Sequence, residues 1–158
     1  MADTQIQRMA RSEHVTAQVS VLETQRDTLA LIGPRILRDH AVKIGPKVYI
    51  TVAGATLMAT VFGFHVREIS SKRIEVDGVG GWETFTEIIR STDEMIVGRG
   101  SAICMDDEKM WSGRPQFARR AMSSTRAAGR ALRLFFGHAF SMLGDQVASV
   151  TREEMPDE

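Results

Sequence analysis

The sequence predicts an α+β fold in which an antiparallel three-stranded meander and one short extra strand pack against a long C-terminal helix and shorter N-terminal helices. Three observations lead to this prediction. Residues 64–104 contain β-branched runs separated by glycine-rich and polar turns, as in a meander. Residues 115–143 have the composition of one long helix. Residues 15–32 repeat apolar side chains at helical intervals, so helices precede and follow the strands.

The elements follow in order along the chain. Gly33 and Pro34 are expected to end the first helix, and residues 35–46 are expected to be irregular or weakly helical. A short strand at residues 47–52 and a compact helix capped by Gly63 come next. Pro115 suits the first turn of the final helix. The strands of the meander are expected at residues 64–76, 82–91 and 95–104, with the glycine-rich turn DGVGG after the first.

The bulk composition fits one soluble domain. The chain has 158 residues, of which 43% are hydrophobic and 25% charged, which is enough to bury a core. No apolar stretch reaches the ~20 residues of a membrane span, and the N-terminus lacks a signal peptide. The single cysteine, Cys104, excludes an intrachain disulfide and is expected to be buried. We therefore expect a cytoplasmic protein with a flexible N-terminus (1–14), one domain (15–144) and an acidic tail (145–158).

Charge is unevenly distributed along the chain. The 20 basic residues balance 20 acidic ones overall, yet the stretch from residue 109 to residue 144 holds seven basic residues and no acid. Residues 145–158 hold five acids and one arginine. We expect this acidic tail to be mobile and dispensable for folding. Such a separation of charge carries information about partners.

Four arginines of the final helix are expected to form a stripe. At ~100° per residue, Arg119, Arg126, Arg130 and Arg133 fall within roughly 60° of one another, with Ser123 on the same line. No carboxylate is expected within reach, and like charges at this spacing repel, so the stripe favours binding of a polyanion through its phosphates. A solvated polar face is the alternative. The opposite side, expected to face the core, carries Phe117, Ala121, Ala128, Leu132, Phe135, Ala139 and Met142.

Further basic and aromatic side chains could extend this surface. Arg120 lies beside the stripe in the final helix, and the predicted strands carry the basic residues Lys72, Arg73 and Arg99. If the sheet curves around the helix, these strand residues form the second wall of a basic groove; otherwise they lie on an ordinary solvent face. Aromatic residues in such a groove would stack on bases, although for Trp82 and Phe85 we favour core positions over stacking; Tyr49 is a third candidate.

The final helix resembles that of single-strand annealing proteins of the Rad-fifty-two type, which include the eukaryotic recombination mediator and phage annealases. The stretch TRAAGRALRLFFGHAFSMLG matches their pattern at Thr125, Arg130, Ala131, Leu132, Arg133 and Phe135. Gly129 replaces a basic residue of that pattern. Upstream, YITVAGATLMATVFGF is similar to the strand–helix opening of the family at Tyr49, Ile50, Gly54, Phe62 and Gly63. The terminal EEMP also echoes phage proteins of this kind.

The resemblance spans roughly residues 47–144 and implies a phage-encoded protein of the bacterial cytoplasm. It implies a homo-oligomeric ring or filament that binds single-stranded DNA in a basic groove, with Arg130 and Arg133 at DNA-contacting positions. A phage exonuclease or a single-strand-binding protein is a further partner of such proteins. The function expected is ATP-independent annealing of complementary strands during homologous recombination.

Other chemistries have weaker support in the sequence. Asp106, Asp107 and Glu108 could hold a divalent metal as in a nuclease, although adjacent acids are usually solvated turn residues. The histidines lack zinc-ligand spacing, no nucleophile has a recognisable base, and no P-loop is present. We therefore expect no enzyme activity, no cofactor and no metal. The remaining alternative is a structural or interaction protein whose basic helix docks an acidic partner.

Overall fold

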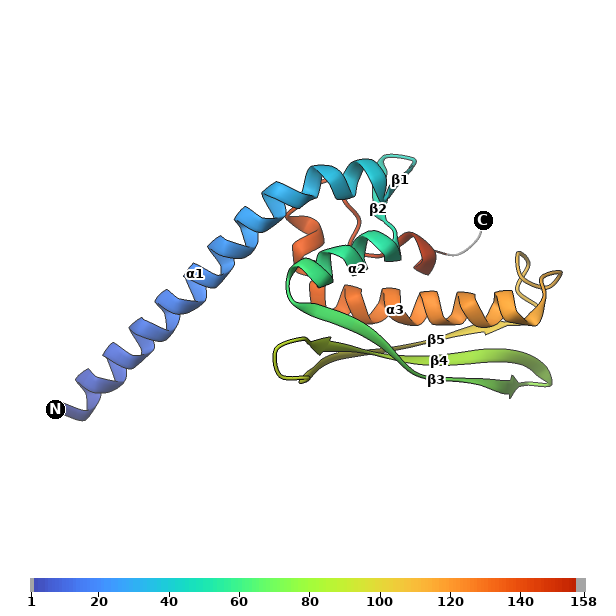
Figure 1. Ribbon diagram of the computed structural model, residues 1–158, viewed down its shortest axis with the longest axis horizontal. Coiled ribbons are helices and arrows are strands. Elements are labelled where there is room, and N and C mark those ends of the chain that lie inside the picture. Colours follow the sequence, from blue (N-terminus) through green and yellow to red (C-terminus); the bar gives the residue numbers. More distant parts are fainter. Residues whose placement is uncertain (1, 156–158) are drawn as a thin grey trace.

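The computed structural model describes residues 2–155, with side chains from residue 13 onward, and it has the α+β architecture that the sequence predicts. A long helix leads into a small hairpin and a short helix, and a three-stranded sheet lies against a second long helix (Figure 1). In chain order the elements are α1 (Ala2–Asp39), β1 (Ala41–Ile44), β2 (Lys47–Ile50), α2 (Val52–Val61), β3 (Phe64–Val76), β4 (Val79–Arg90), β5 (Ile96–Met105), α3 (Gln116–Ser141) and a 3-10 turn, η1 (Arg152–Glu154).

The main sheet is the predicted meander, with the antiparallel order β3-β4-β5. Asp77 and Gly78 form the turn between β3 and β4 with φ values of 52° and 78°. Asp-Gly favours this left-handed backbone in two-residue hairpin turns. The bounds of β3 agree with the prediction, and those of β4 and β5 differ from it by a few residues. A bulge between Glu68 and Ser70 interrupts the pairing of β3 with β4.

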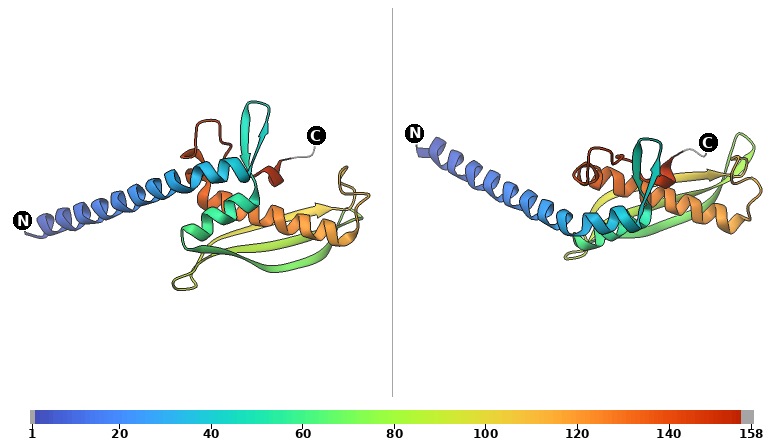
Figure 2. Two further views of the ribbon diagram at one scale, coloured as in Figure 1. Left: turned by 45° about the horizontal axis from the view of Figure 1, so that its top comes forward. Right: turned by 90° about the horizontal axis from the view of Figure 1, so that it is seen from above.

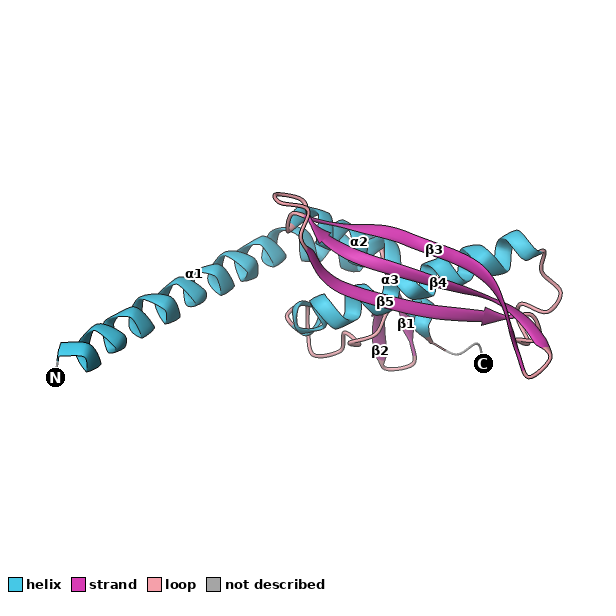
Figure 3. Cartoon of the chain, turned by 90° about the horizontal axis from the view of Figure 1, so that it is seen from below, coloured by secondary structure: helices cyan, strands magenta, loops and turns pink. Residues whose placement is uncertain are grey.

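Helix α3 packs closely on one face of this sheet. The hydroxyl oxygens of Thr84 on β4 and Ser123 on α3 lie 2.5 Å apart, and both residues are buried. A Cβ atom on Gly100 of β5 would lie 2.5 Å from the backbone nitrogen of Ala131 and 2.6 Å from the carbonyl oxygen of Ala127. Small residues thus let the two backbones approach. Among the described residues, no helix covers the opposite face of the sheet (Figure 3).

The buried core is shared by α1, α2, α3 and the sheet. Thr51 caps the start of α2, because its side-chain oxygen accepts a hydrogen bond from the backbone N–H of Gly54 at 3.2 Å. This cap fixes the point at which the chain turns from β2 into the core. The largest fully buried apolar side chains of the core cluster are Ile36, Ile50, Met58, Ile88, Leu132 and Phe140.

Helix α1 is longer than the sequence predicts. Residues 2–14, expected to be a loose start, belong to the helix, and Gly33 and Pro34 do not end it. Pro34 removes one backbone hydrogen bond, and the helix bends where it reaches the body (Figure 2). Burial of Leu29 before the Gly-Pro pair and of Ile36 after it favours continuation of the helix. Within the described chain, no helix has both the length and the apolar character needed to cross a membrane.

The segment after α3 also differs from the expected mobile tail. In its described part, residues 145–155, the backbone N–H of Val48 donates to the carbonyl of Gln146 at 2.9 Å, and Ala148 donates to Val48 at 2.8 Å. Thr151 is fully buried beside Gly129, where a Cβ would lie 2.5 Å from the Thr151 hydroxyl oxygen. Residues 145–155 therefore pack on the domain, and we call this segment the strap.

Candidate nucleic-acid interface

The face of α3 that meets the sheet differs from the predicted one. Phe117, expected in the core, is 76% exposed, and Met142 is 43% exposed. The small residues opposite Gly100 set the contact, and this rotates the helix relative to the prediction. Ser123, expected on the arginine line, is buried for the same reason. The buried residues of α3 are Ser123, Ala127, Gly129, Ala131, Leu132, Phe136, Ala139 and Phe140.

Two arginines of α3 lie along the outer edge of β5. Arg126 donates a hydrogen bond from Nη1 to the carbonyl oxygen of Ile103 at 3.3 Å, and Arg130 donates to that of Ser101 at 2.9 Å. β5 is the last strand of its sheet, so no strand of the described chain uses these carbonyls. Cationic side chains therefore satisfy an edge that would otherwise invite pairing with another strand.

Most of the predicted stripe is neutralised inside the molecule, which corrects the expectation that no acid lies within reach. Arg119 is only 11% exposed in its side chain and Arg126 only 16%, so both serve the fold. The carboxylates come from segments distant in sequence, namely β3, the loop after β5 and the strap. The ion pairs are Arg119–Asp106 at 3.1 Å, Arg126–Glu108 at 2.7 Å, Arg133–Glu154 at 3.2 Å and Arg120–Glu68 at 3.5 Å.

Arg73 and Arg120 belong to a second cluster, on the α3 side of the sheet. Arg73 forms a close bidentate ion pair with Asp106, and its guanidinium lies 6.0 Å from the centroid of the Trp82 ring. The guanidinium of Arg120 lies 5.9 Å from the same ring. The Arg73 hydrogen bond holds the pKa of the Asp106 carboxyl below its ordinary value, with a further contribution from the charge of Arg119. This cluster connects β3, β4, the loop after β5 and α3.

The outer face of the sheet carries acidic and basic side chains that pair with one another. Glu87, with a side chain only 7% exposed, accepts hydrogen bonds from Arg67 and Arg99, each at 3.1 Å. The bond from Arg67 is the largest cause of the lowered pKa of Glu87, followed by that from Arg99, and together they outweigh burial. The Lys72 ammonium pairs with Glu83 at 3.1 Å.

Phe85 lies on this outer face and not in the core as expected. Its neighbour Thr84 contacts α3, so the alternation of side chains along β4 turns Phe85 away from the helix. Phe85 is 37% exposed, and the Lys72 nitrogen lies 5.6 Å from the centroid of its ring. Trp82 is half-buried near the guanidinium groups of Arg73 and Arg120, and Tyr49 is buried. Of the three aromatics considered for base stacking, Phe85 is the one placed on an open sheet face.

A groove of about 450 Å³ brings part of the predicted site together. Two arginines of α3, Arg130 and Arg133, form one side of it, and the strands supply Arg99 and the ring of Phe85. We call this hollow the arginine groove. Its lining residues are Ile69, Phe85, Thr86, Arg99, Gly100, Ser101, Arg130, Arg133 and Leu134.

The arginines of the arginine groove differ in how freely they can bind an external anion. Arg130 is exposed, and no carboxylate of the described residues lies within ion-pair distance of it. Arg99 pairs with Glu87 but keeps 71% of its side chain exposed. Arg133 is 36% exposed and held by Glu154. Arg130 is therefore the cation best placed to meet an external anion, and Arg99 is the second.

Sequence reasoning missed Phe85 as a surface residue and did not select Arg67 or Ile69. The sequence did hold an indication for Phe85. Side chains alternate between the two faces of a strand, so Phe85 lies on the face opposite that of Thr84 and Thr86. The predicted wall formed by Lys72, Arg73 and Arg99 is divided in the structure. Arg99 enters the groove, Lys72 borders it through Phe85, and Arg73 lies on the other face.

Two acids of the triplet after β5, Asp106 and Glu108, are engaged in internal contacts. Asp106 binds Arg73 and Arg119, while Glu108 binds Arg126 and accepts a hydrogen bond from the backbone N–H of Met105 at 2.8 Å. Throughout the described chain, no three histidine, cysteine, aspartate or glutamate side chains are grouped so as to hold a metal ion. The neighbouring arginines make this triplet a poor cation site.

Comparisons of the chain with protein-family models, curated proteins and solved structures find no match.

Proposed function

We propose that this protein binds single-stranded DNA in the arginine groove, with phosphates at Arg130 and Arg99 and a base stacked on Phe85. Proteins that bind single strands combine cations that follow the backbone with aromatic faces that accept bases. The observation that carries the proposal is the exposed ring of Phe85 in the same groove as Arg130, which lacks a carboxylate partner among the described residues.

The chemistry of Arg130 suits a phosphate ligand. Its Nη1 is used by the Ser101 carbonyl, which fixes the guanidinium at the edge of β5. The other donors of a guanidinium form a planar fork that matches two phosphate oxygens. Holding the group in place beforehand lowers the entropy lost on binding. Arg119, Arg120, Arg126 and Arg73, expected to contact DNA, are assigned here to the fold because carboxylates hold them.

We further propose that bound strands anneal with complementary ones without ATP, as the resemblance in the final helix implies. Capture through the phosphates leaves base edges free to pair, while a single stacked base per groove is released at low cost. In this proposal the protein is a binding protein and not an enzyme. An acidic protein segment is the rival ligand, because it would also bind Arg130 and Arg99 but would not need the Phe85 ring.

Fluorescence anisotropy with three probes separates these ligands. The probes are an oligothymidylate, an abasic deoxyribose-phosphate oligomer of equal length and charge, and a polyglutamate peptide. We expect the oligothymidylate to bind most tightly, and Phe85→Ala to weaken it by about 1–3 kcal/mol, the range for loss of one stacked base. The same variant should leave the abasic oligomer unaffected.

Equal binding of all three probes, unchanged in Phe85→Ala, would contradict the proposal and favour an acidic protein partner. Phe85→Leu is the matched control for folding, because it keeps an apolar side chain at the same place on the sheet. Circular dichroism of each variant excludes unfolding as the cause of lost binding.

A further inference from the structure

The first described side chains of α1 project from the body as an arm. Every side chain from residue 13 to residue 24 is exposed, whereas Leu29, Gly33 and Ile36 further along the helix are buried. Figures 1 and 2 show the helix leaving the body at a fork beside the end of α3. An isolated helical segment of this length has little stability in water unless one of its faces is packed.

The exposed arm carries apolar side chains on the face that packs further along the same helix. Val15 is 51% exposed, Val19 47% and Leu22 53%. At ~100° per residue these three lie within roughly 60° of one another, and Leu29 and Ile36 continue the line at seven-residue steps. The face that is bare on the arm is therefore continuous with the face that contacts the body.

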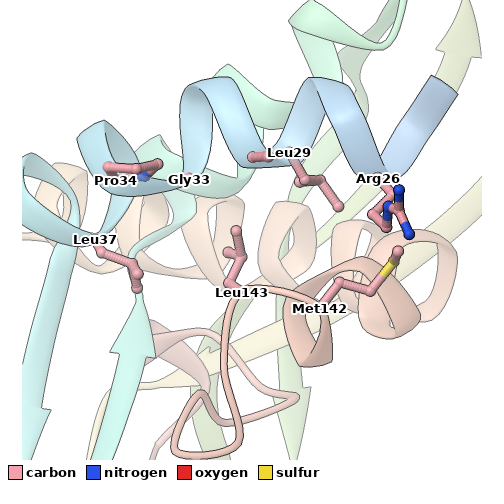
Figure 4. Close-up of a pocket in the computed structure, with 8 residues that line it drawn as sticks. Arg26, Leu29, Gly33, Pro34, Leu37, Met142 and Leu143 are labelled. Carbon is pink, nitrogen blue, oxygen red and sulfur yellow. The ribbon is translucent and has the colours of Figure 1, made fainter. Parts of the chain in front are cut away.

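Where the arm joins the body, this face of α1 packs closely on the end of α3. A Cβ on Gly33 would lie 2.9 Å from Cδ2 of Leu143, so the glycine allows α1 to approach the end of α3. Figure 4 shows Leu143 beneath Gly33, with Leu29 and Leu37 to either side. The contact is apolar and ends near Arg26, beyond which the line of Leu22, Val19 and Val15 has no described neighbour.

An apolar hollow of about 130 Å³ lies in the fork between arm and body. Leu29 and Gln25 line it from α1, and four phenylalanines line it from the body together with Met142. The four are Phe62, Phe64, Phe135 and Phe136; the rings of Phe62 and Phe136 are stacked, and those of Phe64, Phe135 and Phe136 meet edge to face. One element inserted into this fork would contact the bare line of α1 and the hollow at the same time.

We propose that the arm of a second copy of this chain fills the fork, antiparallel to α1, so that two copies form a two-fold dimer. If Leu22 meets Leu22 of the second copy, then Val15 of that copy lies level with Leu29, at the hollow. The distance from Val15 to Leu29 is 14 residues, about 21 Å along a helix, so each arm is long enough to reach. A two-fold contact of this kind uses one surface twice.

Charge does not oppose a second copy as the occupant. In this register Arg26 lies level with Gln18 of the other arm, and Glu23 lies level with Val21. No charged side chain between residues 13 and 31 then faces one of like sign. The dimer does not depend on the proposed function, since it involves neither Arg130 nor Phe85.

Light scattering of the full chain without nucleic acid tests the dimer. We expect a dimeric mass at tens of micromolar, and a monomeric mass for the Val15→Asp/Leu22→Asp variant with an unchanged circular dichroism spectrum. Leu31→Asp is the control, because Leu31 is 83% exposed on the opposite face of the same helix. This control should stay dimeric. A monomeric parent protein, or equal loss of the dimer in Leu31→Asp, would overturn the proposal.

Cross-linking gives a second measurement that does not depend on weakening the contact. Leu22→Cys should form a disulfide-linked dimer on mild oxidation, because the two copies of residue 22 meet at the two-fold axis. Leu31→Cys should not. The native Cys104 is fully buried, and burial raises the pKa of its thiol to about 11, so it does not compete. Equal cross-linking of both variants would overturn the antiparallel pairing.

Discussion

Nη1 of Arg130 lies 2.9 Å from the carbonyl oxygen of Ser101, so the most available arginine of α3 is anchored to the free edge of β5. The same contact has two consequences. It closes part of a sheet edge against unwanted strand pairing. It also holds a cation in the groove that the sheet and the helix form together, whose lining includes Phe85.

The contact between α3 and β5 depends on the absence of a side chain at Gly100. Gly100→Ala should lower the free energy of unfolding by at least about 2 kcal/mol, because the added Cβ would overlap the backbone of Ala127 and Ala131. Gly137→Ala is the matched control within α3, where a Cβ meets nothing within 4 Å. It should raise the free energy of unfolding by up to about 1 kcal/mol. Urea denaturation of both variants measures the contrast, and equal stabilities would contradict the packing described.

Removal of residues 151–158 should destabilise the fold, contrary to what a loose acidic tail would do. The deletion removes Thr151 from its buried site and Glu153 from the start of α2, where its Oε2 accepts a hydrogen bond from Val52 N at 3.0 Å. Loss of such a helix-terminal partner costs about 0.5–2 kcal/mol. Thermal denaturation should show a lower melting temperature. An unchanged one would mean that the strap does not support the fold.

Acidic pH should weaken the cluster around Asp106. Its carboxyl has an ordinary pKa of 3.8, and the hydrogen bond from Arg73 lowers the pKa in the folded state. A lowered pKa contributes stability above the ordinary value, and that stability is lost as pH falls through the folded-state value. Asp106→Asn should therefore be less stable than the parent at neutral pH, and the difference should shrink below about pH 4. A difference independent of pH in denaturation curves would rule out the ion pair as its source.

Glu154 should restrain DNA binding, given the proposed function. It lies 3.2 Å from Nε of Arg133, one of the arginines of the groove. Glu154→Gln keeps the shape of the strap and frees the charge of Arg133. Affinity for an oligothymidylate should therefore increase, and the slope of log K against log salt should steepen by about 0.7. Glu23→Gln, on the exposed arm, is the control with the same change of charge. Equal effects of the two variants would show that only net charge matters.

Local patterns allowed most of the fold to be predicted. The bounds of β3 follow from its β-branched run and the Asp-Gly turn, which are properties of adjacent residues. The continuation of α1 through Pro34 could not be predicted, because burial of Leu29 and Ile36 against the body offsets the local cost of proline. The packing of the strap could not be predicted for the same reason, because it depends on a contact between distant residues. Buried Thr151 fits into a space that only Gly129 leaves.

The candidate site was harder to predict than the fold. Helical periodicity grouped the arginines of α3 correctly, but their partners come from elsewhere in the chain. Asp106 and Glu108 reach the helix from the loop after β5, and Glu154 reaches it from the strap. These contacts turn most of the expected DNA-binding residues into internal ion pairs. The remaining surface, around Arg130 and Phe85, becomes visible only when the strands and the helix are placed together.

The salt dependence of oligothymidylate binding decides whether DNA binds in the arginine groove, with the parent protein, Arg130→Ala and Arg114→Ala compared. Arg114 is an exposed arginine outside the groove, so its variant matches the change in charge. We predict that Arg130→Ala binds more weakly and lowers the slope of log K against log salt by about 0.7, the value for one lost single-strand phosphate contact. Arg114→Ala should retain the parent's affinity and slope. If folded Arg130→Ala binds with the affinity and slope of the parent, DNA does not bind in the arginine groove.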